Sequence, residues 1–196
     1  MKQFAPAFER NRDPITEVLG KVLPNSGLAL EIGSGAGQHV SWFAKNWPGL
    51  TWQPSEMAHL DSIDAWAGES GCANISPAIR LDLNAPEYDG PAPNAILCIN
   101  VVHIVSWPLV QNLFAFAGRI LAPSGRLFVY GPYRYAGQPL EPSNQQFEQW
   151  LKSRDPQSAI RSFEAVNELA AQAGLKLIAD VAMPANNRSI WWQKQD

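Results

Sequence analysis

The stretch Leu28–Val40 reads LALEIGSGAGQHV and places three glycines at alternate positions, directly after an apolar run and before a helix-like segment. A short apolar run that ends in glycines predicts a buried parallel strand and a tight turn into a helix. Glycine has no Cβ, so this turn can adopt positive φ angles and admit a ligand against the backbone. The N–H groups at the start of the helix would face that ligand. We therefore expect a nucleotide-type cofactor at the turn.

The spacing of Gly33, Gly35 and Gly37 distinguishes between kinds of cofactor. A dinucleotide fingerprint, G-x-G-x-x-G, would place its third glycine at position 38, which is Gln38. The Lys–Ser/Thr pair of a phosphate-binding loop is also missing. The pattern is instead E-x-G-x-G-x-G, starting at Glu31, and it resembles the first motif of class I S-adenosylmethionine-dependent methyltransferases. A glycine-rich turn without a ligand is the alternative, but three such glycines cost chain entropy when nothing approaches them.

S-adenosylmethionine (SAM) suits these residues because it carries no phosphate. Its ammonium and sulfonium groups are favoured by a carboxylate at the turn, here that of Glu31, and its own carboxylate is favoured by a helix N-terminus. Ser34, between the first two glycines, belongs to the same predicted cofactor site.

Length and composition limit the class of protein. With 196 residues, of which 46% are hydrophobic, the chain is expected to form one globular domain over 1–196. A net charge of −3 and the lack of any Lys/Arg cluster argue against nucleic acid as a partner, so we expect a small-molecule substrate. Cys72 and Cys98 form no disulfide framework and lack metal-ligand spacing, which suits a reducing cytoplasm and predicts no metal. The sequence shows no signal peptide, and its longest apolar run, 95–105, is too short to span a membrane.

Strand and helix patterns alternate along the chain. Apolar or alternating runs predict strands at Leu28–Ile32, Leu50–Gln53, Ile79–Leu83, Ala95–Asn100, Arg126–Tyr130, Leu175–Met183 and Ser189–Gln193. Amphipathic periodicity predicts helices at Pro14–Val22, Gly37–Lys45, Met57–Ala67, Leu109–Leu121, Ser143–Lys152 and Ser162–Ala173. This alternation predicts a Rossmann-like, doubly wound α/β sheet with helices on both faces, ending in an antiparallel hairpin at its edge.

The first helix is expected to start at Pro14, because Asp13 is a favourable N-cap and proline is favourable in the first turn. Arg10 and Asn11 then precede the helix, either as solvated loop residues or as part of a lid over the cofactor. His39 lies in the first turn of the next helix, beside the glycines. It is either a packed histidine or a contact to ligand or substrate.

Polar residues end the next three strands, where open α/β sheets bind their ligands. Glu56 stands 19 residues after Gly37, a spacing that lets an acid reach the ribose hydroxyls of a nucleoside, although it could also cap the following helix. Asp82 ends the third strand and could accept a hydrogen bond from an adenine amino group, with Leu83 beside it. Asn100 ends the fourth strand, either close to the reacting group or simply as a polar strand terminator.

Candidate catalytic residues come later in the chain. His103 is a candidate proton acceptor because an unperturbed histidine titrates near pH 6.5, and a structural role is the alternative. Trp107, shortly after it, is a candidate substrate contact. Segment 131–137 and the prolines that follow it are predicted to form a long loop. Tyr133 and Arg134 would make this loop a substrate wall or lid.

With these elements placed, the whole chain resembles class I methyltransferases, and most closely a methyltransferase-like family of unassigned substrate found in bacteria and animals. The stretches that carry the resemblance are ERNRDPI at 9–15, SGAGQH at 34–39, WQPSE at 52–56, INVVHI at 99–104, YGPY at 130–133, SNQQFE at 143–148, IR at 160–161 and MPANN at 183–187. The chain departs from the family pattern where it has Glu56 and Glu148 in place of Asp, and Ser158 and Ala159 in place of Trp-Gly.

The resemblance implies a seven-stranded sheet of order 3-2-1-4-5-7-6 whose strand 7 is antiparallel. It implies cofactor contacts at Glu31, Gly33, Gly35, Glu56, Asp82 and Asn100. It places around the open side of the site Arg10, Asn11, His39, His103, Tyr133, Asn144, Arg161, Asn186 and Asn187.

These observations lead to two hypotheses. In the first, the protein transfers the methyl group of SAM to a small polar or anionic molecule and releases S-adenosylhomocysteine (SAH). His103 and Tyr133 would be catalytic, and Arg134 and Arg161 would contact the substrate. In the second, the protein binds SAM or SAH without transferring a methyl group, as a sensor or partner subunit. Amino-directed modification of nucleic acid is disfavoured because no D/N-P-P-Y/F motif begins at Asn100.

Overall fold

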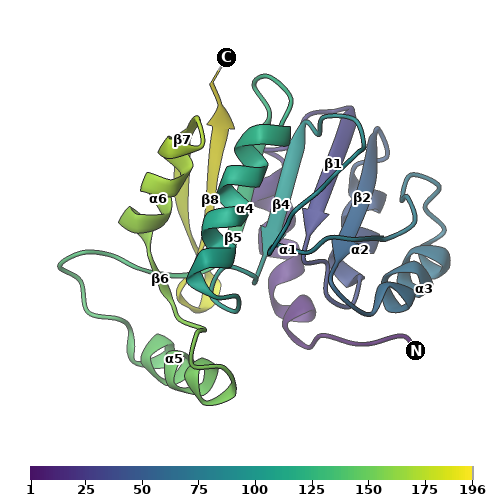
Figure 1. Ribbon diagram of the computed structural model, residues 1–196. Helices are drawn as coiled ribbons and strands as arrows, with labels where there is room; N and C mark the ends of the chain where they lie inside the picture. Colours follow the sequence, from purple (N-terminus) through teal and green to yellow (C-terminus); the bar gives the residue numbers. More distant parts are fainter. Residues whose placement is uncertain (196) are drawn as a thin grey trace.

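A mixed sheet with the strand order β3-β2-β1-β4-β5-β8-β7 organises the computed structural model, which describes residues 1–195 (Figure 1). The strands from β3 to β5 in this order run parallel, and β8 is antiparallel to both β5 and β7. The predicted Rossmann-like sheet, its order and its antiparallel edge hairpin are confirmed. The strands are β1 Gly27–Ile32, β2 Leu50–Glu56, β3 Ile79–Arg80, β4 Ala95–Ile99, β5 Arg126–Arg134, β6 Arg161–Ser162, β7 Leu175–Met183 and β8 Asn187–Lys194.

Helices cover both faces of the sheet. Side chains of α4 and α6 pack on one face and those of α1, α2 and α3 on the other, whereas α5 stands apart, beyond the carboxyl ends of the parallel strands (Figure 1). The helices are α1 Ala7–Leu19, α2 Gln38–Asn46, α3 Leu60–Ser70, α4 Trp107–Ile120, α5 Pro142–Arg154 and α6 Phe163–Gln172, and the 3-10 turn η1 Pro184–Asn186 links β7 to β8. Within residues 1–195, no helix is long and apolar enough to cross a membrane.

The central strand β4 is buried on both faces, which explains its continuous apolar sequence. Ile96 and Cys98 pack in the cluster that contains α4, whereas Ala95, Leu97 and Ile99 pack in the cluster that contains α1, α2 and α3. None of these five side chains is more than 6% exposed. The middle of the sheet is therefore held from both sides, and its carboxyl ends form a fixed platform for a site.

The first helix starts at Ala7 and not at Pro14, so Arg10 and Asn11 lie on the helix and not in a loop. Pro14 sits inside the helix, where it removes the hydrogen bond to the carbonyl of Arg10. Burial outweighs this loss, because side chains at helical spacing form one stripe against the protein. The buried residues of this stripe are Phe8, Asn11, Ile15, Val18 and Leu19.

Two further boundaries differ from the sequence prediction. Helix α3 starts at Leu60, after His59 adopts a left-handed conformation with φ of 60°, so Glu56 ends β2 and does not cap the helix. Strand β3 contains only Ile79–Arg80, because only these two residues pair with β2. Asp82 therefore lies beyond the strand and not at its end.

Strand β5 continues to Arg134 and takes in the first part of the segment that the sequence predicts as a loop. Its end is paired on both sides, with β8 as far as Pro132 and with β6 at Tyr133 and Arg134. The two-residue strand β6 is too short for any periodic pattern, so the sequence gives no sign of it. The prediction of Tyr133 as a loop residue is wrong because this additional pairing extends the strand.

Gly37 precedes α2 and keeps α2 close to α3. It has a φ of +95°, and a Cβ at this position would lie 2.6 Å from the Cα of Ile63. Gly71, after α3, has a φ of +72°, but a Cβ there would meet nothing within 4 Å. We expect Gly71→Ala to lower the free energy of unfolding by about 1 kcal/mol through backbone strain alone.

For Gly37→Ala we expect a larger loss, roughly 3 kcal/mol, because α3 must also move to accept the methyl group. Urea unfolding of both variants beside the wild type measures the difference. Equal losses in the two variants would contradict the close approach of α2 and α3 as the reason for Gly37.

Candidate active site

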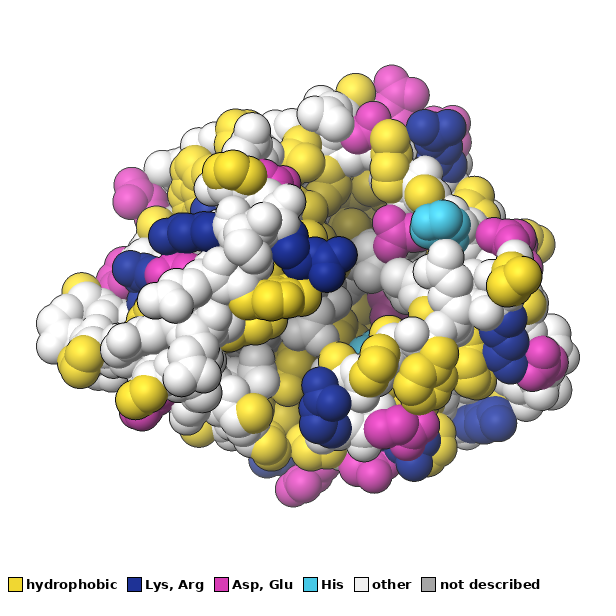
Figure 2. Space-filling model, turned by 90° about the horizontal axis from the view of Figure 1, so that it is seen from below, with side chains coloured by type: hydrophobic (Ala, Val, Ile, Leu, Met, Phe, Trp, Pro, Cys, Tyr) yellow, Lys and Arg dark blue, Asp and Glu magenta, His cyan; other side chains and the backbone are white. Residues whose placement is uncertain are grey.

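A cavity of about 340 Å³ opens at the carboxyl ends of β1, β2 and β4. It lies where β1 has β2 on one side and β4 on the other, which is the switch point of the doubly wound sheet. Figure 2 shows this face, which is hollowed near its centre, with hydrophobic side chains inside the hollow and charged side chains around its rim. The cavity is lined by Ala5, Ala7, Phe8, Gly33, Ser34, Gly35, Ala36, Gln38, His39, Glu56, Ile99, Asn100, Val101, Ile104 and Val105.

The three glycines of the turn all have positive φ, but their surroundings differ: two of them make room for a neighbouring side chain or helix, and the third faces open space. A Cβ at Gly33 would lie 2.5 Å from Cγ2 of Val101, so this glycine lets the turn approach the loop after β4. Gly37 makes room for α3 in the same way. A Cβ at Gly35 would meet nothing within 4 Å, so this position faces open space in the cavity. The site where a ligand can approach the backbone is therefore Gly35.

Glu56, the last residue of β2, fastens β2 to the glycine turn. Its Oε2 accepts a hydrogen bond from the N–H of Gly35 at 2.8 Å, and its Oε1 accepts one from the N–H of Met57 at 2.7 Å. A carboxylate offers about four lone-pair positions, so both oxygens can still accept hydrogen bonds from a ligand. Within residues 1–195, Glu56 is the only Asp or Glu that lines the cavity, and no Lys or Arg lines it.

Glu31 lies at the end of β1, directly before the turn, and is 1% exposed. Burial raises the pKa of its carboxyl to about 7. A hydrogen bond with Ser34 acts in the opposite direction, and the negative charge of Glu56 adds to the increase. Its Oε2 is buried and has no hydrogen-bond partner. With two acids and no basic lining residue in the described chain, the turn favours a positively charged ligand.

His39, on the first turn of α2, lines the cavity and joins α2 to α1. Its ring packs edge-on against Phe8 and stacks on Phe43. Burial lowers its pKa to about 4, so the ring is neutral at pH 7. Nε2 lies 2.9 Å from Oδ1 of Asn11. Since an amide oxygen only accepts, Nε2 donates this hydrogen bond and Nδ1 has the lone pair.

Asn100 follows β4 and borders the cavity between Ile99 and Val101. Its φ of 58° is left-handed, a conformation that asparagine tolerates better than most residues. Its N–H donates to the carbonyl of Tyr130 at 2.9 Å, which ties the end of β4 to β5. Within residues 1–195, no group of three or more His, Cys, Asp or Glu is arranged to hold a metal ion.

Six predicted cofactor contacts lie outside the lining of this cavity: Glu31, Gly37 and Asn11, which are described above, and Asp82, Leu83 and Arg10. Asp82 accepts hydrogen bonds through Oδ1 from the backbone N–H and the side-chain Nδ2 of Asn84, at 2.8 and 2.9 Å, and these bonds lower its pKa. Leu83 is buried in the core cluster that contains α4. Arg10 is exposed on α1. Their contacts with a cofactor stay predictions.

His103 lies in the loop after β4 but is not among the residues that line the cavity. It is 3% exposed and packs edge-on against Phe147 of α5. Burial, with a smaller contribution from the positive charge of Arg161, lowers its pKa to about 4. Gly131 leaves room for the ring, since a Cβ there would lie 3.0 Å from Nδ1 of His103. His103 is therefore a neutral, enclosed histidine close to the carboxyl end of β5.

Tyr133 lies in the core cluster formed with α4 and α6 and is 5% exposed. Its hydroxyl is buried without a hydrogen-bond partner, and burial raises its pKa well above the usual value. The side chain does not line the cavity. This is the environment of a packed core residue, and none of the described contacts supports the predicted catalytic role of the Tyr133 hydroxyl.

Arg134 and Arg161 donate their hydrogen bonds to other groups of the protein. Arg134 donates to both carboxylate oxygens of Glu148 at 2.7 and 2.8 Å, and to the carbonyl of Ile160 at 3.0 Å. Arg161 donates to the carbonyls of Val102 and Gln157, at 3.2 and 2.8 Å, and to that of Val105. Its guanidinium also lies over the ring of Trp107. Both arginines therefore fix α5 and the loop after β4 in place.

The three predicted asparagines form a second group of internal contacts. Asn144 Nδ2 donates to the carbonyl of Asn186 at 3.2 Å, and Asn186 Nδ2 donates to Oγ of Ser143 at 3.1 Å. Asn187 Nδ2 donates to the carbonyl of Pro184 at 3.1 Å. The bonds of Asn144 and Asn186 join the start of α5 to η1, and the bond of Asn187 joins the start of β8 to η1. None of the three asparagines lines the cavity.

The sequence prediction missed several lining residues. Phe8 and its neighbours Ala5 and Ala7 were not expected to contact the cavity, because the helix was expected to begin only at Pro14. The helical spacing of Phe8 with the apolar residues that follow it is the signal that could have found it. In the sequence Gln38 stands out only as a departure from the dinucleotide motif, and no pattern predicts its place in the cavity wall.

The match to a protein family covers almost the whole chain. The family described as "Protein of unknown function (DUF938)" matches residues 2–194. The chain belongs to the DUF938 family. The match includes every segment that lines the cavity, from Ala5 to Val105.

This DUF938 member is similar in fold to solved methyltransferases. An O-methyltransferase family protein from Burkholderia thailandensis matches with a TM-score of 0.82 and 13% identity, over 97% of this chain and 58% of that one. An O-methyltransferase family 2 protein from Planctomyces limnophilus, in complex with apigenin, matches with a TM-score of 0.79 and 19% identity, over 96% of this chain and 60% of that one. Human N-acetylserotonin methyltransferase in complex with SAM matches with a TM-score of 0.79 and 14% identity, over 97% of this chain and 53% of that one. The chain spans somewhat more than half the length of these proteins, and at such identities the likeness shows a shared fold.

Glu31 makes the stability of the protein depend on pH. Its pKa is raised from 4.5 to about 7 in the folded state. The stability that this group contributes is therefore fully present below pH 4.5 and is lost as the pH rises through 7. Glu31→Gln removes this loss, so its effect on the free energy of unfolding should be more favourable at pH 8 than at pH 5, by up to about 3 kcal/mol.

Guanidinium unfolding of the wild type and the variant at both pH values measures this effect. His39 and His103, whose pKa values are lowered to about 4, are present in both proteins and cancel in the difference. Glu87→Gln, at an exposed acid, serves as the control and should show no such pH dependence. If Glu31→Gln changes the free energy of unfolding equally at pH 5 and pH 8, the pKa of the Glu31 carboxyl is not raised in the folded protein.

Proposed function

We propose that this protein is a SAM-dependent methyltransferase that acts on a small polar or anionic molecule and forms SAH as its product. The observation that carries the proposal is a pair of acids at an open glycine turn. Glu56 lines the cavity, Glu31 is buried with an unpartnered oxygen, and Gly35 leaves the backbone accessible. These acids would repel the phosphates of a dinucleotide, whereas they attract an ammonium and a sulfonium. The fold shared with methyltransferases supports the same choice.

The residues at the turn fit the nucleoside and the sulfonium of SAM. Glu56 would accept hydrogen bonds from the ribose hydroxyls, since its bonds to Gly35 and Met57 leave lone pairs on both oxygens. The open space beside Gly35 would take the chain next to the sulfonium. Asn100 would border this chain on the side of β4.

The ends of the cofactor would lie beyond these residues. Asp82 and Leu83 follow β3 and are the proposed contacts of the adenine. Arg10 and Asn11, on the helix that faces the same cavity, are the proposed contacts at the amino-acid end. Asn11 is already oriented by its hydrogen bond with His39, and the exposed guanidinium of Arg10 is the complement that a carboxylate requires.

Bound SAM would supply a methyl group on a sulfonium, which is transferred by in-line displacement. The protein then has to position the acceptor and exclude water, and positioning can lower a barrier by roughly 7–11 kcal/mol. The apolar lining on the acceptor side suits this task, since it offers no competing nucleophile. It consists of Phe8, Ile99, Val101, Ile104 and Val105.

The low pKa of His103 bears on the acceptor. A histidine with a pKa of about 4 is a weak base at neutral pH and a poor match for a hydroxyl proton. An acceptor that is already a carboxylate or another anion needs no base, and then His103 would orient it. A general base is therefore not required where the acceptor is an anion, which is one of the two substrate classes proposed above.

The second candidate function is binding of SAM or SAH without methyl transfer. The specific observation in its favour is that neither His103 nor Tyr133 lines the cavity. A sensor or partner subunit would need the turn, Glu31 and Glu56 but no catalytic group. Both functions predict cofactor binding, so turnover has to separate them.

SAH binding tests the cofactor site. We expect the wild type to bind SAH in titration calorimetry and Glu56→Gln to bind it at least tenfold more weakly, because a hydrogen bond to a charged group contributes about 1.5–3 kcal/mol. Glu87→Gln, an exposed acid outside the cavity, should bind as the wild type does. If the wild type does not bind SAH at millimolar concentration, the protein is not a SAM-dependent enzyme.

Methyl transfer from labelled SAM to a metabolite extract separates the two functions. We expect transfer by the wild type and by Tyr133→Phe, since the Tyr133 hydroxyl is buried away from the cavity. His103→Asn should reduce transfer while SAH binding is retained, because His103 lies outside the cofactor cavity. Binding of SAH without any transfer to a complete extract would favour the sensor.

A further inference from the structure

The segment before α1 forms one wall of the cofactor cavity. Ala5 lines the cavity together with Ala7 and Phe8 at the start of the helix. In Figure 1 this segment runs past the carboxyl ends of the strands, from α1 towards α3. A ligand in the cavity would therefore lie between this segment and the glycine turn.

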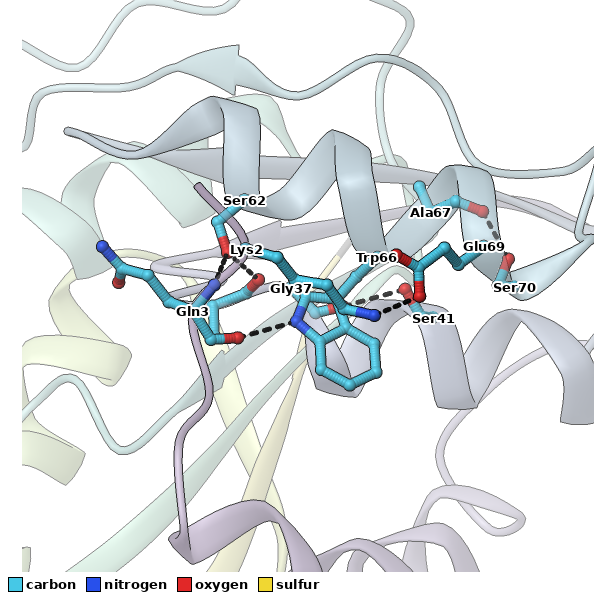
Figure 3. A network of polar contacts seen from close by, with 10 residues as sticks. Lys2, Gln3, Gly37, Ser41, Ser62, Trp66, Ala67, Glu69 and Ser70 are labelled. Carbon is cyan, nitrogen blue, oxygen red and sulfur yellow. Dashed lines mark hydrogen bonds and ion pairs between the residues drawn. The ribbon is translucent and has the colours of Figure 1, made fainter.

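Hydrogen bonds tie the segment to α3 and, through α3, to the turn (Figure 3). The N–H of Gln3 donates to Oγ of Ser62 at 2.8 Å, and Nε1 of Trp66 donates to the carbonyl of Gln3 at 2.8 Å. Oγ of Ser62 donates in turn to the carbonyl of Ala36 at 2.9 Å. The fully buried Ser62 thus connects the segment directly to the turn that would hold the cofactor.

Two further contacts hold the segment at its ends. The N–H of Ala5 donates to Oε1 of Gln38 at 2.6 Å, and Gln38 also lines the cavity. The ammonium of Lys2 lies 3.6 Å from the centre of the Trp66 ring and forms an ion pair with Glu69. Trp66 therefore contacts the segment twice, once as a hydrogen-bond donor and once as an aromatic surface.

The segment is attached by polar bonds and not by apolar burial. Phe4 is 58% exposed, and residues 3–6 are all exposed, whereas Phe8 is only 5% exposed. Segments with few buried apolar contacts open at low free energy. Residues 2–6 can therefore detach while α1 remains packed on the protein.

We propose that residues 2–6 are a latch over the cofactor cavity, and that Ser62 and Trp66 are positioning residues that hold it closed and thereby set the rate of cofactor release. This inference rests on the proposed SAM site. Closing the latch completes the wall at Ala5, and opening it breaks the bonds to Gln3 and Ala5 without disturbing Glu56 or Gly35.

The release rate of SAH, measured by stopped flow, tests the latch. Trp66→Phe removes the donor to Gln3 but keeps a ring for Lys2, and the loss of one hydrogen bond corresponds to release about three- to tenfold faster. Ser62→Ala loses the bonds to both Gln3 and Ala36, so we expect an effect at least as large.

A matched control is Trp192→Phe. Nε1 of Trp192 donates to Oδ1 of Asn167 at 2.9 Å, in the core cluster with α4 and α6, away from the segment. This variant also loses an indole hydrogen bond, here from a buried tryptophan to a side-chain oxygen, and it should release SAH at the wild-type rate. It therefore separates a loss of latch contacts from a general loss of stability, which the melting temperature of each variant records.

Hydrogen exchange gives a second readout. SAH should slow amide exchange at Gln3 and Ala5 in the wild type, and less so in Trp66→Phe. If SAH binds but Trp66→Phe and Ser62→Ala release it at the wild-type rate, the latch is overturned while the cofactor site stands. If the wild type does not bind SAH, the proposed function and the latch fall together.

Discussion

The site depends on a buried carboxylate, that of Glu31, which is fixed at the end of a strand with one oxygen unpartnered. Such a group is unfavourable in the free protein, because removal of its charge from water is costly. It cannot turn to solvent, since residues of β1 on both faces are packed in the two core clusters. The negative charge of Glu56 makes the situation less favourable still. A positively charged ligand would relieve both acids at once, so the same constraint that lowers the stability of the protein favours a cation at the turn.

The polar residues divide into two groups that look alike in the sequence. Glu56, at the end of β2, keeps free acceptor positions at the cavity, and Glu31, at the end of β1, keeps one buried oxygen without a partner. Arg134 and Arg161, in contrast, have their donors engaged by Glu148 and by backbone carbonyls. Helix α5 and the short β6 have little core of their own, and these arginines hold them in place instead. The region of α5 and β6 is therefore held by two arginines whose donors are already engaged within the protein.

The sequence predicts features that depend on local pattern. Apolar runs predict the buried strands, and the glycine turn with Glu56 follows from positive φ and from the length of one βα unit. The prediction that α1 starts at Pro14 is wrong, because burial of the apolar face of the helix outweighs the preference of proline for the first turn. The prediction that Tyr133 lies in a loop is wrong, because pairing with β6, which is distant in the sequence, extends β5 through this residue. The bonds of Arg161 reach carbonyls 56 and 59 residues away, and spacing within one element cannot predict contacts of that kind.

The way α1 is anchored determines which side of the cavity can open. His39 bonds Asn11, and Nε1 of Trp42 donates to Thr16 at 2.9 Å, so α1 is joined to α2 at two levels as well as through its buried stripe. Movement of the whole helix would break all of these contacts. The residues before Phe8 are less buried, and they contact the side of α3 through hydrogen bonds. If residues 2–6 act as the proposed latch, exchange of a cofactor would use their side of the cavity. Such an exchange would leave the contacts between α1 and α2 unchanged, because none of them involves residues 2–6.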